Sequence, residues 1–581
     1  MSRPAKVLLA GLALSLAVAI TAPADLEADT FGYFSYLHTV VFDRDLVLAN
    51  EYAIFGVKEP GVTESGASHS LYAVGPAVAW LPFYLATHVV LSAGEFVIDL
   101  PWPVDGLSLP YQYAARWGTA FWFLLSVHLL HREMAGRLSR SATHLGLAGA
   151  IVATPALYYA TVGLTMAHGL AAAWACLSFA GGMAALRSGS ARDWAWCGAA
   201  LGLLMMTRWQ AFAFALFPLL VALWRLFRDR RELKGAVIGA LAGLAAFFPQ
   251  MLVWKLQYGV WVWIPRYYGP RANVRWFDPS TAHWQDILWS ANKGLFVWTP
   301  LTLLCVVGLV MALRRAPVVS IGGGLVFVAT VILGSATPDW HGSDAFGSRK
   351  FDLMLPFFAW GLARLSESLL KRPALVVGLG VASFGLWNVG MIRLKSEGRL
   401  DSSPSVARIA TAQVALASDD ARGLLTWAFG PKGTENWYRL FVGDYIYVTS
   451  NPSGELRLSD PDSPYLALGF SEAVNGDGAP RWRWAAPTAC VKFPIERSRD
   501  PLRASVRLRN APGIGEQRFE IQLNDVTVGS GESRPDWSEP EFFLPPSAQV
   551  TGMNRVCFKF SESVTIEGEA RSAAVSVVRL P

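Results

Sequence analysis

Apolar runs long enough to cross a bilayer recur along the first two thirds of the 581-residue chain. A spanning helix needs about 20 apolar residues. The first run comes after a basic start and ends in "APA", which also fits a signal peptide. We favour an uncleaved helix, and both interpretations place the residues after Asp25 outside. The pattern predicts about eleven spans, the later ones starting near Tyr113, Ala142, His168, Trp194, Ala211, Gly235, Phe296, Val318, Phe351 and Pro373.

Short basic clusters between these runs predict the orientation, because short cytoplasmic loops are enriched in Lys and Arg. The clusters all become cytoplasmic only if the apolar stretch His69–Ala93 does not cross. Residues 69–95 are therefore predicted to form re-entrant or surface-lying helices, broken near Gly75-Pro76 and at Pro82. The amino terminus is then inside and the carboxyl terminus outside. The clusters are His131–Arg140, Arg187–Asp193, Arg225–Lys234, Arg314–Pro317 and Lys371–Pro373.

The pattern changes after Leu394, where the chain becomes polar and rich in turn residues. The runs "RASVRLRN", "RFEIQLNDVTVGS" and "RVCFKF" alternate with a period of two, which predicts antiparallel strands and an all-β sandwich. The predicted domains are a transmembrane domain at residues 1–395, a helical connection at 396–425, and an extracytoplasmic β-sandwich at 426–581. The predicted fold class is thus an α-helical polytopic membrane protein with a C-terminal all-β domain.

Composition agrees with this division. Only 16% of the residues are charged, against roughly a quarter in soluble domains. The net charge of +6 does not indicate nucleic acid as a partner, since the basic residues sit in short clusters between apolar runs. Three of the five cysteines fall in apolar spans and are predicted core residues. Cys490 and Cys557 lie in the polar part and are candidates for a disulfide.

Polar and aromatic residues gather in the loops predicted to lie outside, namely residues 23–68, 154–168, 207–210, 257–300 and 337–350. Carboxylates there can act as a general base or hold a metal. Arginines can clamp phosphate through paired hydrogen bonds, and aromatic rings can stack on sugars. This combination indicates transfer of a sugar from a lipid-linked phosphate at the outer leaflet.

Five stretches resemble bacterial polytopic glycosyltransferases of the GT-C superfamily, of the protein-mannosyltransferase and aminoarabinose-transferase types. They are "DTFGYFSYL…DRDLVLANEY", "LYAVGPAVAWLPFYLATH", "TPALYYATVGLTMAHGL", "NKGLFVWTPL" and "WHGSDAFGSRKFDLMLPFFAWGLA". The resemblance covers residues 1 to about 394 in layout. It implies a polyprenyl-phosphate sugar donor, inverting transfer at the outer face of the bacterial cytoplasmic membrane, and a catalytic Asp in the first outer loop.

By position, that residue is Asp29, which would deprotonate the acceptor hydroxyl. Thr30 comes next, where the family commonly has an acidic residue or Gly. The alternative for Asp29 is a helix N-cap. Asp43 and Asp45 form a D-x-D pair that is either a second carboxylate site for a divalent cation or a solvated loop; no cofactor is otherwise expected. Candidates for binding donor phosphate or substrate, each with a structural or lipid-headgroup alternative, are His168, Arg208, Arg266, Tyr267, Lys293, His341 and Arg349.

The stretch "GFSEAVNGDGAPRWRWAAPTACVKFPI" resembles the carbohydrate-binding-like β-sandwich of cell-envelope glycosyltransferases. Trp482 and Trp484 share one face of a strand and either stack on sugar or pack as a lid. The expected partners are the donor, a glycan, lipid or protein acceptor, and membrane lipids. A transporter or flippase of lipid-linked glycans is the alternative function, and it predicts charges at mid-depth and paired broken helices. A glycan-binding receptor is a third hypothesis, and it leaves the spans and outer loops unexplained.

Overall fold

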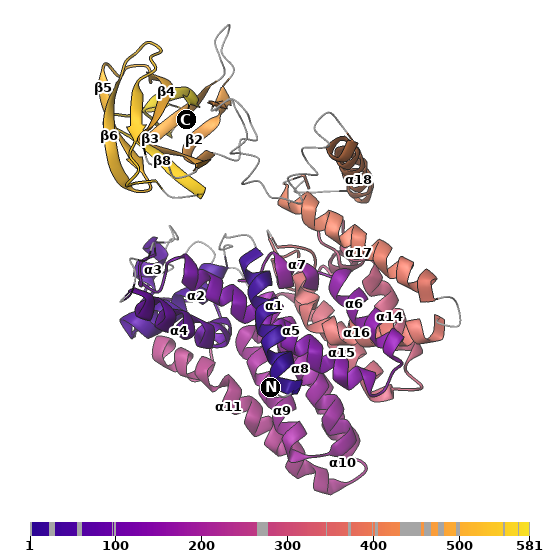
Figure 1. Cartoon of the computed structure of the whole chain (residues 1–581). Coiled ribbons are helices and arrows are strands. Elements are labelled where there is room, and N and C mark those ends of the chain that lie inside the picture. The colour runs from indigo at the N-terminus through magenta and orange to yellow at the C-terminus, as the bar shows by residue number, and fades with distance from the viewer. Residues whose placement is uncertain are drawn as a thin grey trace. The chain divides into compact units, whose positions relative to one another are not determined.

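The computed structural model divides the chain into a helical unit, Met1–Ser418, and a mainly β unit, Asp419–Pro581 (Figure 1). The division falls inside the last helix. The structure describes all residues except 1–2, 22–28, 55–60, 96, 98–99, 101, 264–276, 344, 370–373, 398, 401–404, 430–454, 458–465, 475–481, 496–499, 550–551, 567–568 and 580–581.

Among the described residues, 6 helical stretches are long and apolar enough to cross a membrane, namely Gly75–Glu95, Ala167–Ser188, Trp209–Leu226, Arg230–Tyr258, Pro317–Ser335 and Val377–Ser396. The predicted fold class, a polytopic helical membrane protein with an all-β C-terminal part, is confirmed. Other predicted spans contain helices that are shorter, of 13, 11 and 15 residues after Ala142, Phe296 and Phe351.

The helices and helical turns, in chain order, are α1 (Arg3–Thr21), α2 (Thr30–His38), η1 (Thr39–Asp43), α3 (Ala49–Ile54), α4 (Gly75–Glu95), α5 (Leu109–Ala135), α6 (Arg140–Val152), α7 (Ala156–Thr161), α8 (Ala167–Ser188), α9 (Ala191–Thr207), η2 (Trp209–Ala215), α10 (Leu216–Leu226), η3 (Arg230–Glu232), α11 (Leu233–Tyr258), η5 (Pro279–Thr281), α12 (Asp286–Trp289), α13 (Leu295–Trp298), α14 (Leu301–Met311), α15 (Pro317–Ser335), η6 (Arg349–Met354), α16 (Leu355–Leu369), α17 (Ala374–Ser396) and α18 (Val406–Phe429).

Helix α8 forms the centre of the helical unit. Every residue from Ala167 to Met183 is buried, and the helix packs against α5, α9, α10 and η6. A helix that is apolar all round belongs in the interior of a bundle. Because α8 starts at Ala167, it also fixes the position of His168 in its first turn.

Glycines let neighbouring helices approach closely. Gly198 and Gly202 on α9 face Gly239 and Gly243 on α11, and a Cβ added at either α9 position would overlap the carbonyl oxygen opposite. Gly308 on α14 meets the carbonyl oxygen of Gly361 on α16 in the same way. Small residues spaced four apart are the usual means of close packing between membrane helices, where dispersion replaces the hydrophobic effect.

Helix α4 differs from the predicted helical pair. It begins at Gly75 with Pro76 in its first turn, where proline is favoured. It then continues through Pro82 as one helix to Glu95, so the predicted break at Pro82 is wrong. At this position the proline removes one backbone hydrogen bond, the one to the carbonyl oxygen of Val78. Whether α4 crosses the membrane stays a prediction.

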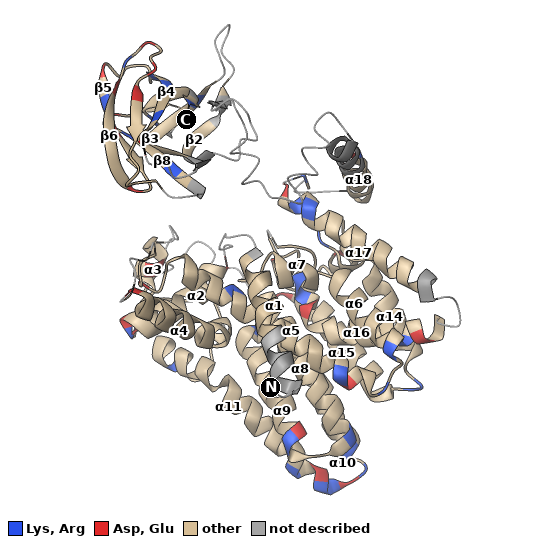
Figure 2. Cartoon of the chain, in the orientation of Figure 1, with Lys and Arg blue, Asp and Glu red and all other residues tan. Residues whose placement is uncertain are grey.

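Charged side chains gather at the ends of the helices, most densely around the turn between α10 and α11, whereas the middle of each long helix is mostly uncharged (Figure 2). This turn is the predicted basic cluster Arg225–Lys234. There Arg225 pairs with Glu232, and Asp229 caps the short turn η3 through the amide of Arg231.

The β unit is a strongly curved antiparallel sheet. Its main path runs β6-β5-β8-β3-β11-β4-β7, with β2 paired to β3 and β1 to β11. The two ends of that path, β6 and β7, contact each other, so the sheet folds over its own core. The strands are β1 (Glu455–Arg457), β2 (Leu466–Val474), β3 (Trp482–Ile495), β4 (Leu502–Asn510), β5 (Gln517–Leu523), β6 (Val526–Ser533), β7 (Glu541–Leu544), β8 (Gly552–Phe560), β9 (Val564–Ile566), β10 (Glu569–Arg571) and β11 (Ala573–Arg579).

The predicted alternation is confirmed in β4 and β5, where buried and exposed residues follow one another. Asn524 and Asp525 join β5 to β6 with positive φ values of 50° and 68°, as a two-residue hairpin turn requires. Cys490 on β3 lies opposite Cys557 on β8, and the two form a disulfide. The free cysteines of the described chain, Cys176, Cys197 and Cys305, are buried.

Candidate functional site

An ion pair joins the residue just before α2 to the segment before α16. The carboxylate of Asp29 accepts a hydrogen bond from Nη1 of Arg349 at 3.1 Å. Asp29 stands at the N-cap position of α2, but its side chain makes no capping hydrogen bond. Asp29 thus occupies the position that the helix-cap alternative predicts, while its side chain pairs with Arg349 instead of capping the helix. Its side chain keeps 37% of its surface exposed, so a substrate can reach it.

Asp339 organises the segment between α15 and η6. Its carboxylate lies 3.5 Å from Nη2 of Arg349 and 3.7 Å from Nδ1 of His341, and it accepts a hydrogen bond from the amide of Ser343. Lys293, from the turn between α12 and α13, donates to the carbonyl oxygen of Ser343. Two predicted residues, His341 and Lys293, therefore hold this segment rather than face Asp29 directly.

A buried chain of polar groups runs behind Arg349. Nη1 of Arg208 lies 2.7 Å from both ring nitrogens of His168, and Nδ1 hydrogen-bonds the carboxylate of Asp352. His168 thus links Arg208 to the buried carboxylate of Asp352. Arg208 comes directly after the last residue of α9, so its positive charge lies at the C-terminal end of that helix.

Aromatic packing fixes the same region. The ring of Tyr159 lies 4.4 Å from that of His168. Its hydroxyl donates to the carbonyl oxygen of Phe346 and accepts from the amide of the same residue. Phe346 is fully buried and stacks on Tyr158. The backbone just before Arg349 is thus held by two hydrogen bonds and a ring stack.

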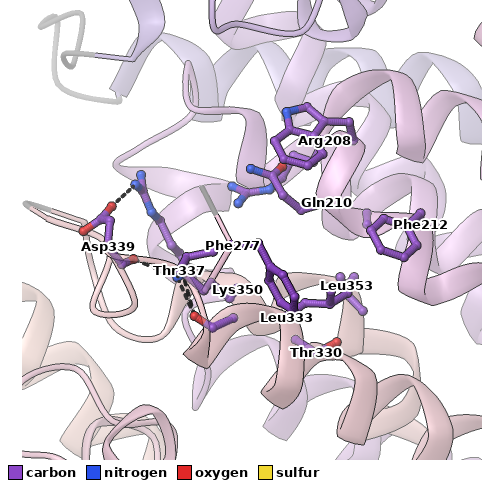
Figure 3. Close-up of a pocket in the computed structure, with 14 residues that line it drawn as sticks. Arg208, Gln210, Phe212, Phe277, Thr330, Leu333, Thr337, Asp339, Lys350 and Leu353 are labelled. Atoms are coloured by element: carbon purple, nitrogen blue, oxygen red, sulfur yellow. Dashed lines mark hydrogen bonds and ion pairs between the residues drawn. The ribbon is translucent and has the colours of Figure 1, made fainter. Parts of the chain in front are cut away.

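A cavity of about 410 Å³ opens beside these residues. Figure 3 shows polar side chains at one end, with Asp339 and Lys350 labelled, and apolar ones, Phe212 and Leu353, at the other. Arg208 and Arg349 also line it. Phe212 is 47% exposed on the outside of the bundle. The cavity therefore combines an anion-binding end with an apolar end, which suits an amphipathic ligand with a charged head. Its remaining lining residues are Trp209, Gln210, Ala211, Phe277, Thr330, Leu333, Gly334 and Thr337.

Lys350 is the cation of the cavity whose charge responds to pH. Its ammonium group donates to the carbonyl oxygens of Gly334 and Asp339 and to the hydroxyl of Thr337. Burial, together with the nearby positive charges of Arg349 and Arg208, lowers the pKa of Lys350 to about 7, against a smaller opposing effect of Asp339. A neutral fraction of Lys350 is therefore present near physiological pH.

The predicted residues fall into several groups. Asp29, Arg349, Arg208 and His168 lie together, with Lys293 and His341 in the supporting segment. Arg266 and Tyr267 lie outside the described residues. Asp43 and Asp45 do not share a face as the D-x-D prediction requires, because Asp45 turns to the hydroxyl of Thr39 and the amide of Val47. That pairing of Asp43 with Asp45 is wrong.

The two tryptophans of the β unit lie on β3 as predicted. Trp482 is only 9% exposed, and the guanidinium of Arg509 covers its ring at 5.1 Å. The ring centroids of Trp482 and Trp484 are 6.4 Å apart. Sugar stacking by this pair stays a prediction.

Sequence reasoning missed two residues of the site, namely Asp339 and Asp352. Asp339 lies within a stretch singled out for its polar residues. Its lining of the cavity depends on the fold of that segment. Asp352 sits in an apolar run, and an acidic residue in such a run is a signal for function that could have found it.

No protein-family model and no curated protein matches the chain. Its fold is similar to that of the arabinosyltransferase EmbB from Mycobacterium smegmatis, with a TM-score of 0.35 and 13% identity over 100% of this chain. The chain spans 64% of EmbB. A second similar structure is ArnT from Cupriavidus metallidurans bound to undecaprenyl phosphate, with a TM-score of 0.38, 15% identity, and coverage of 70% of this chain and 75% of ArnT.

The C-terminal part is similar to carbohydrate-binding modules. One is a family 35 module from Clostridium thermocellum, with a TM-score of 0.16 and 15% identity over 22% of this chain and 96% of the module.

Proposed function

We propose that the chain is a membrane glycosyltransferase that moves a sugar from a polyprenyl-phosphate donor to a cell-envelope glycan, lipid or protein. The reaction takes place at the outer face of the bacterial cytoplasmic membrane. The observation that carries the proposal is the cavity itself: Arg208, Arg349 and Lys350 line it together with an apolar wall, and Asp29 is paired to one of these cations.

The donor phosphate occupies the cationic end of the cavity. Arg349 and Arg208 offer planar pairs of N–H donors that match phosphate oxygens, and Lys350 adds a third charge. The first part of the polyprenyl chain lies along Phe212, Leu333 and Leu353. Positive charge held in place there stabilises the phosphate as it leaves with the electron pair of the broken bond.

Asp29 acts as the general base. The acceptor hydroxyl loses its proton to Asp29 as its oxygen attacks the anomeric carbon. The bond from that carbon to the phosphate oxygen breaks on the opposite side, so the configuration inverts. In the ligand-free chain Arg349 holds Asp29. Donor phosphate competes for the same guanidinium and so leaves the carboxylate available to the acceptor. A positioned base contributes about 10²–10⁴ in rate.

The test compares the wild type with Asp29→Asn in detergent, across a panel of polyprenyl-phosphate sugars. We expect at least about a 100-fold loss of transfer with retained binding of undecaprenyl phosphate, the ligand in the ArnT structure. Asp286→Asn is the matched control, because Asp286 is an exposed acidic residue paired with His283 and lies outside the cavity lining. Its turnover should equal that of the wild type.

Unchanged turnover in Asp29→Asn would show that Asp29 is not the general base, but the protein could still be a glycosyltransferase. The transporter hypothesis would be favoured by two results together: the wild type transfers sugar from no donor, and it moves a lipid-linked glycan across the membrane of proteoliposomes. These two results separate the residue assignment from the function.

A further inference from the structure

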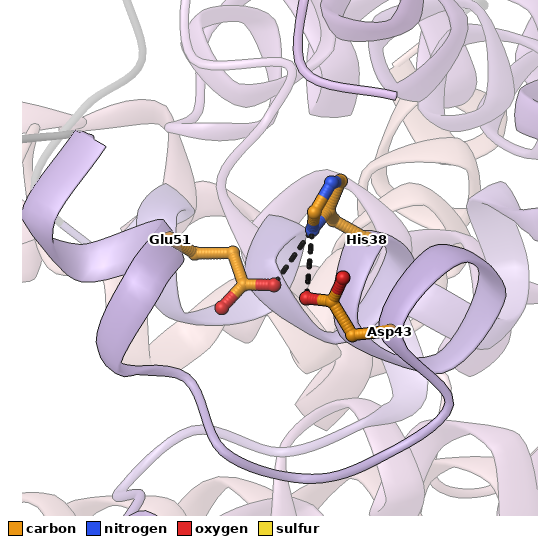
Figure 4. A group of neighbouring side chains, drawn as sticks. All are labelled: His38, Asp43 and Glu51. Atoms are coloured by element: carbon orange, nitrogen blue, oxygen red, sulfur yellow. Dashed lines mark hydrogen bonds and ion pairs between the residues drawn. The ribbon is translucent and has the colours of Figure 1, made fainter. Parts of the chain in front are cut away.

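Three side chains of the first outer loop converge away from Asp29 (Figure 4). Nδ1 of His38 lies 2.7 Å from a carboxylate oxygen of Glu51 and 3.4 Å from one of Asp43. One ligand atom from each residue lies within 4.8 Å of the other two. Figure 4 shows both carboxylates directed at the same edge of the imidazole ring.

The local backbone explains how residues five apart meet. His38 ends α2, and Asp43 ends η1, a π-helical turn. In an α-helix, side chains five residues apart diverge by about 140°, whereas a π-turn, with its i→i+5 hydrogen bonds, stacks them. Arg44 then adopts a positive φ of 61°, which ends the turn and sends the chain toward Glu51. Single π-turns of this kind are frequent at functional sites.

Glu51 is the member of the cluster whose hydrogen-bonding capacity is not filled by the described protein. It is 0% exposed, and its second carboxylate oxygen, Oε2, has no hydrogen-bond partner. Within the described chain no Lys or Arg pairs with Glu51 or Asp43; both ion pairs go to His38. A buried carboxylate with an unpaired oxygen needs a further positive partner.

The other two side chains are held in place. The ring of His38 stacks on Phe42, with centroids 5.2 Å apart and planes within 9°. Asn50 donates to the Asp43 oxygen that faces His38, at 2.7 Å. Such outer contacts orient metal ligands in known sites. The side chain of Asp43 is 31% exposed, so an ion can enter from solvent.

We propose that His38, Asp43 and Glu51 bind a divalent transition-metal ion, Zn²⁺ or Mn²⁺. One imidazole and two carboxylates suit these ions, whereas Ca²⁺ and Mg²⁺ take oxygen ligands only. Zn–N and Zn–O bonds of about 2.0–2.2 Å place tetrahedral ligands about 3.3 Å apart. The 3.4 Å between Nδ1 of His38 and the Asp43 oxygen fits this value. The 2.7 Å between Nδ1 of His38 and the Glu51 oxygen widens by about 0.6 Å to admit the ion.

The site is distinct from the proposed chemistry. Helix α2 separates the two, since Asp29 precedes its first residue and His38 is its last. Nine residues at the α-helical rise make the separation about 13 Å. The ion therefore cross-links α2, η1 and α3 and fixes the outer loop that carries Asp29.

The experiment uses the full chain in detergent, stripped with a chelator and then titrated with Zn²⁺ or Mn²⁺. We expect about one equivalent bound, with a rise of several degrees in the thermal midpoint. His38→Gln, Asp43→Asn and Glu51→Gln should each weaken binding about 10-fold or more. Asp45→Asn is the matched control, because it removes a carboxylate from the same loop outside the cluster, and it should leave binding unchanged.

Glu51→Gln also distinguishes a metal ligand from a structural partner of His38. If Glu51 is a metal ligand, Glu51→Gln is at least as stable as the metal-free wild type. It also loses the metal-dependent rise in the thermal midpoint. If Glu51 serves only His38, the stripped variant melts lower and the metal response persists. Three results would overturn the proposal. They are that second result for Glu51→Gln, loss of metal binding in Asp45→Asn, and no metal binding by the wild type. Each readout is independent of sugar transfer.

Discussion

At the scale of single residues, Lys350 offers the clearest link between charge and binding. Its folded-state pKa of about 7 is below the ordinary value of 10.5. A bound anion favours the ammonium form, so Lys350 takes up a proton when phosphate binds. The affinity of the cavity for phosphate should therefore fall as pH rises above 7, by up to 10-fold per pH unit until the pKa of the complex is passed.

This pH dependence is measured with undecaprenyl phosphate between pH 7 and about 9.5, where the phosphate itself no longer titrates. Lys350→Arg keeps its charge across this range and should flatten the profile, whereas Lys350→Met should bind weakly at every pH. An equally steep profile in Lys350→Arg would show that another group takes up the proton.

The same residues show what a sequence reveals about a site. Asp29 and Arg349 were each predicted from their type and loop, since charged residues beside apolar runs are rare and often functional. Their pairing was not, because 320 positions separate them. Asp339 was missed for a different reason: its contacts with Arg349, His341 and Ser343 are local, but they depend on how one short segment folds back on itself.

At the scale of helices, close packing on glycine gives a prediction about stability. Gly308→Ala places a methyl group against the carbonyl oxygen of Gly361, so α14 and α16 must move apart. We expect a loss of about 1–3 kcal/mol, measured as a lower thermal midpoint in detergent.

The control is Gly324→Ala on α15, where an added Cβ meets nothing within 4 Å. Because Ala favours helix over Gly by up to about 1 kcal/mol, this variant should be as stable as the wild type or slightly more stable. Equal effects of the two substitutions would mean that helix propensity, and not packing against Gly361, decides the outcome.

Elements with a strong local period were the easiest to predict. The strands β4 and β5 alternate buried with partly exposed residues. Strand β6 lies in the same alternating run as β5, and β8 lies in the third run. Two features depart from the prediction. Helix α4 continues through Pro82, and the π-helical turn η1 brings Asp43 next to His38. The hydropathy pattern reveals neither feature, because each depends on the backbone conformation at a single position.

At the scale of the whole molecule, the orientation in the membrane is a prediction that labelling can test. The basic turn between α10 and α11 should be cytoplasmic, and the turn η5 should be outside. Arg230 and Ser280 are exposed residues in these two turns. In intact cells, a membrane-impermeant maleimide should label Ser280→Cys and spare Arg230→Cys until the membrane is opened.

The native thiols of the described chain give little background, because Cys176, Cys197 and Cys305 are buried and Cys490 is bonded to Cys557. Labelling of Arg230→Cys alone in intact cells would reverse the orientation, with α4 as the first segment to reconsider. Labelling of both positions would mean that α11 does not carry the chain across the membrane between the two turns.

The ion pair between Asp29 and Arg349 also governs when activity can arise. Asp29 leaves the ribosome 320 residues ahead of its partner, so the first half of the chain is inserted with an incomplete site. At about 5–20 residues per second, Arg349 is synthesised roughly 16–64 s later. A nascent or prematurely terminated chain that ends before residue 349 therefore lacks this ion pair. If Asp29, Arg349 and Lys350 carry the proposed chemistry, transfer can begin only after the segment before α16 has been synthesised.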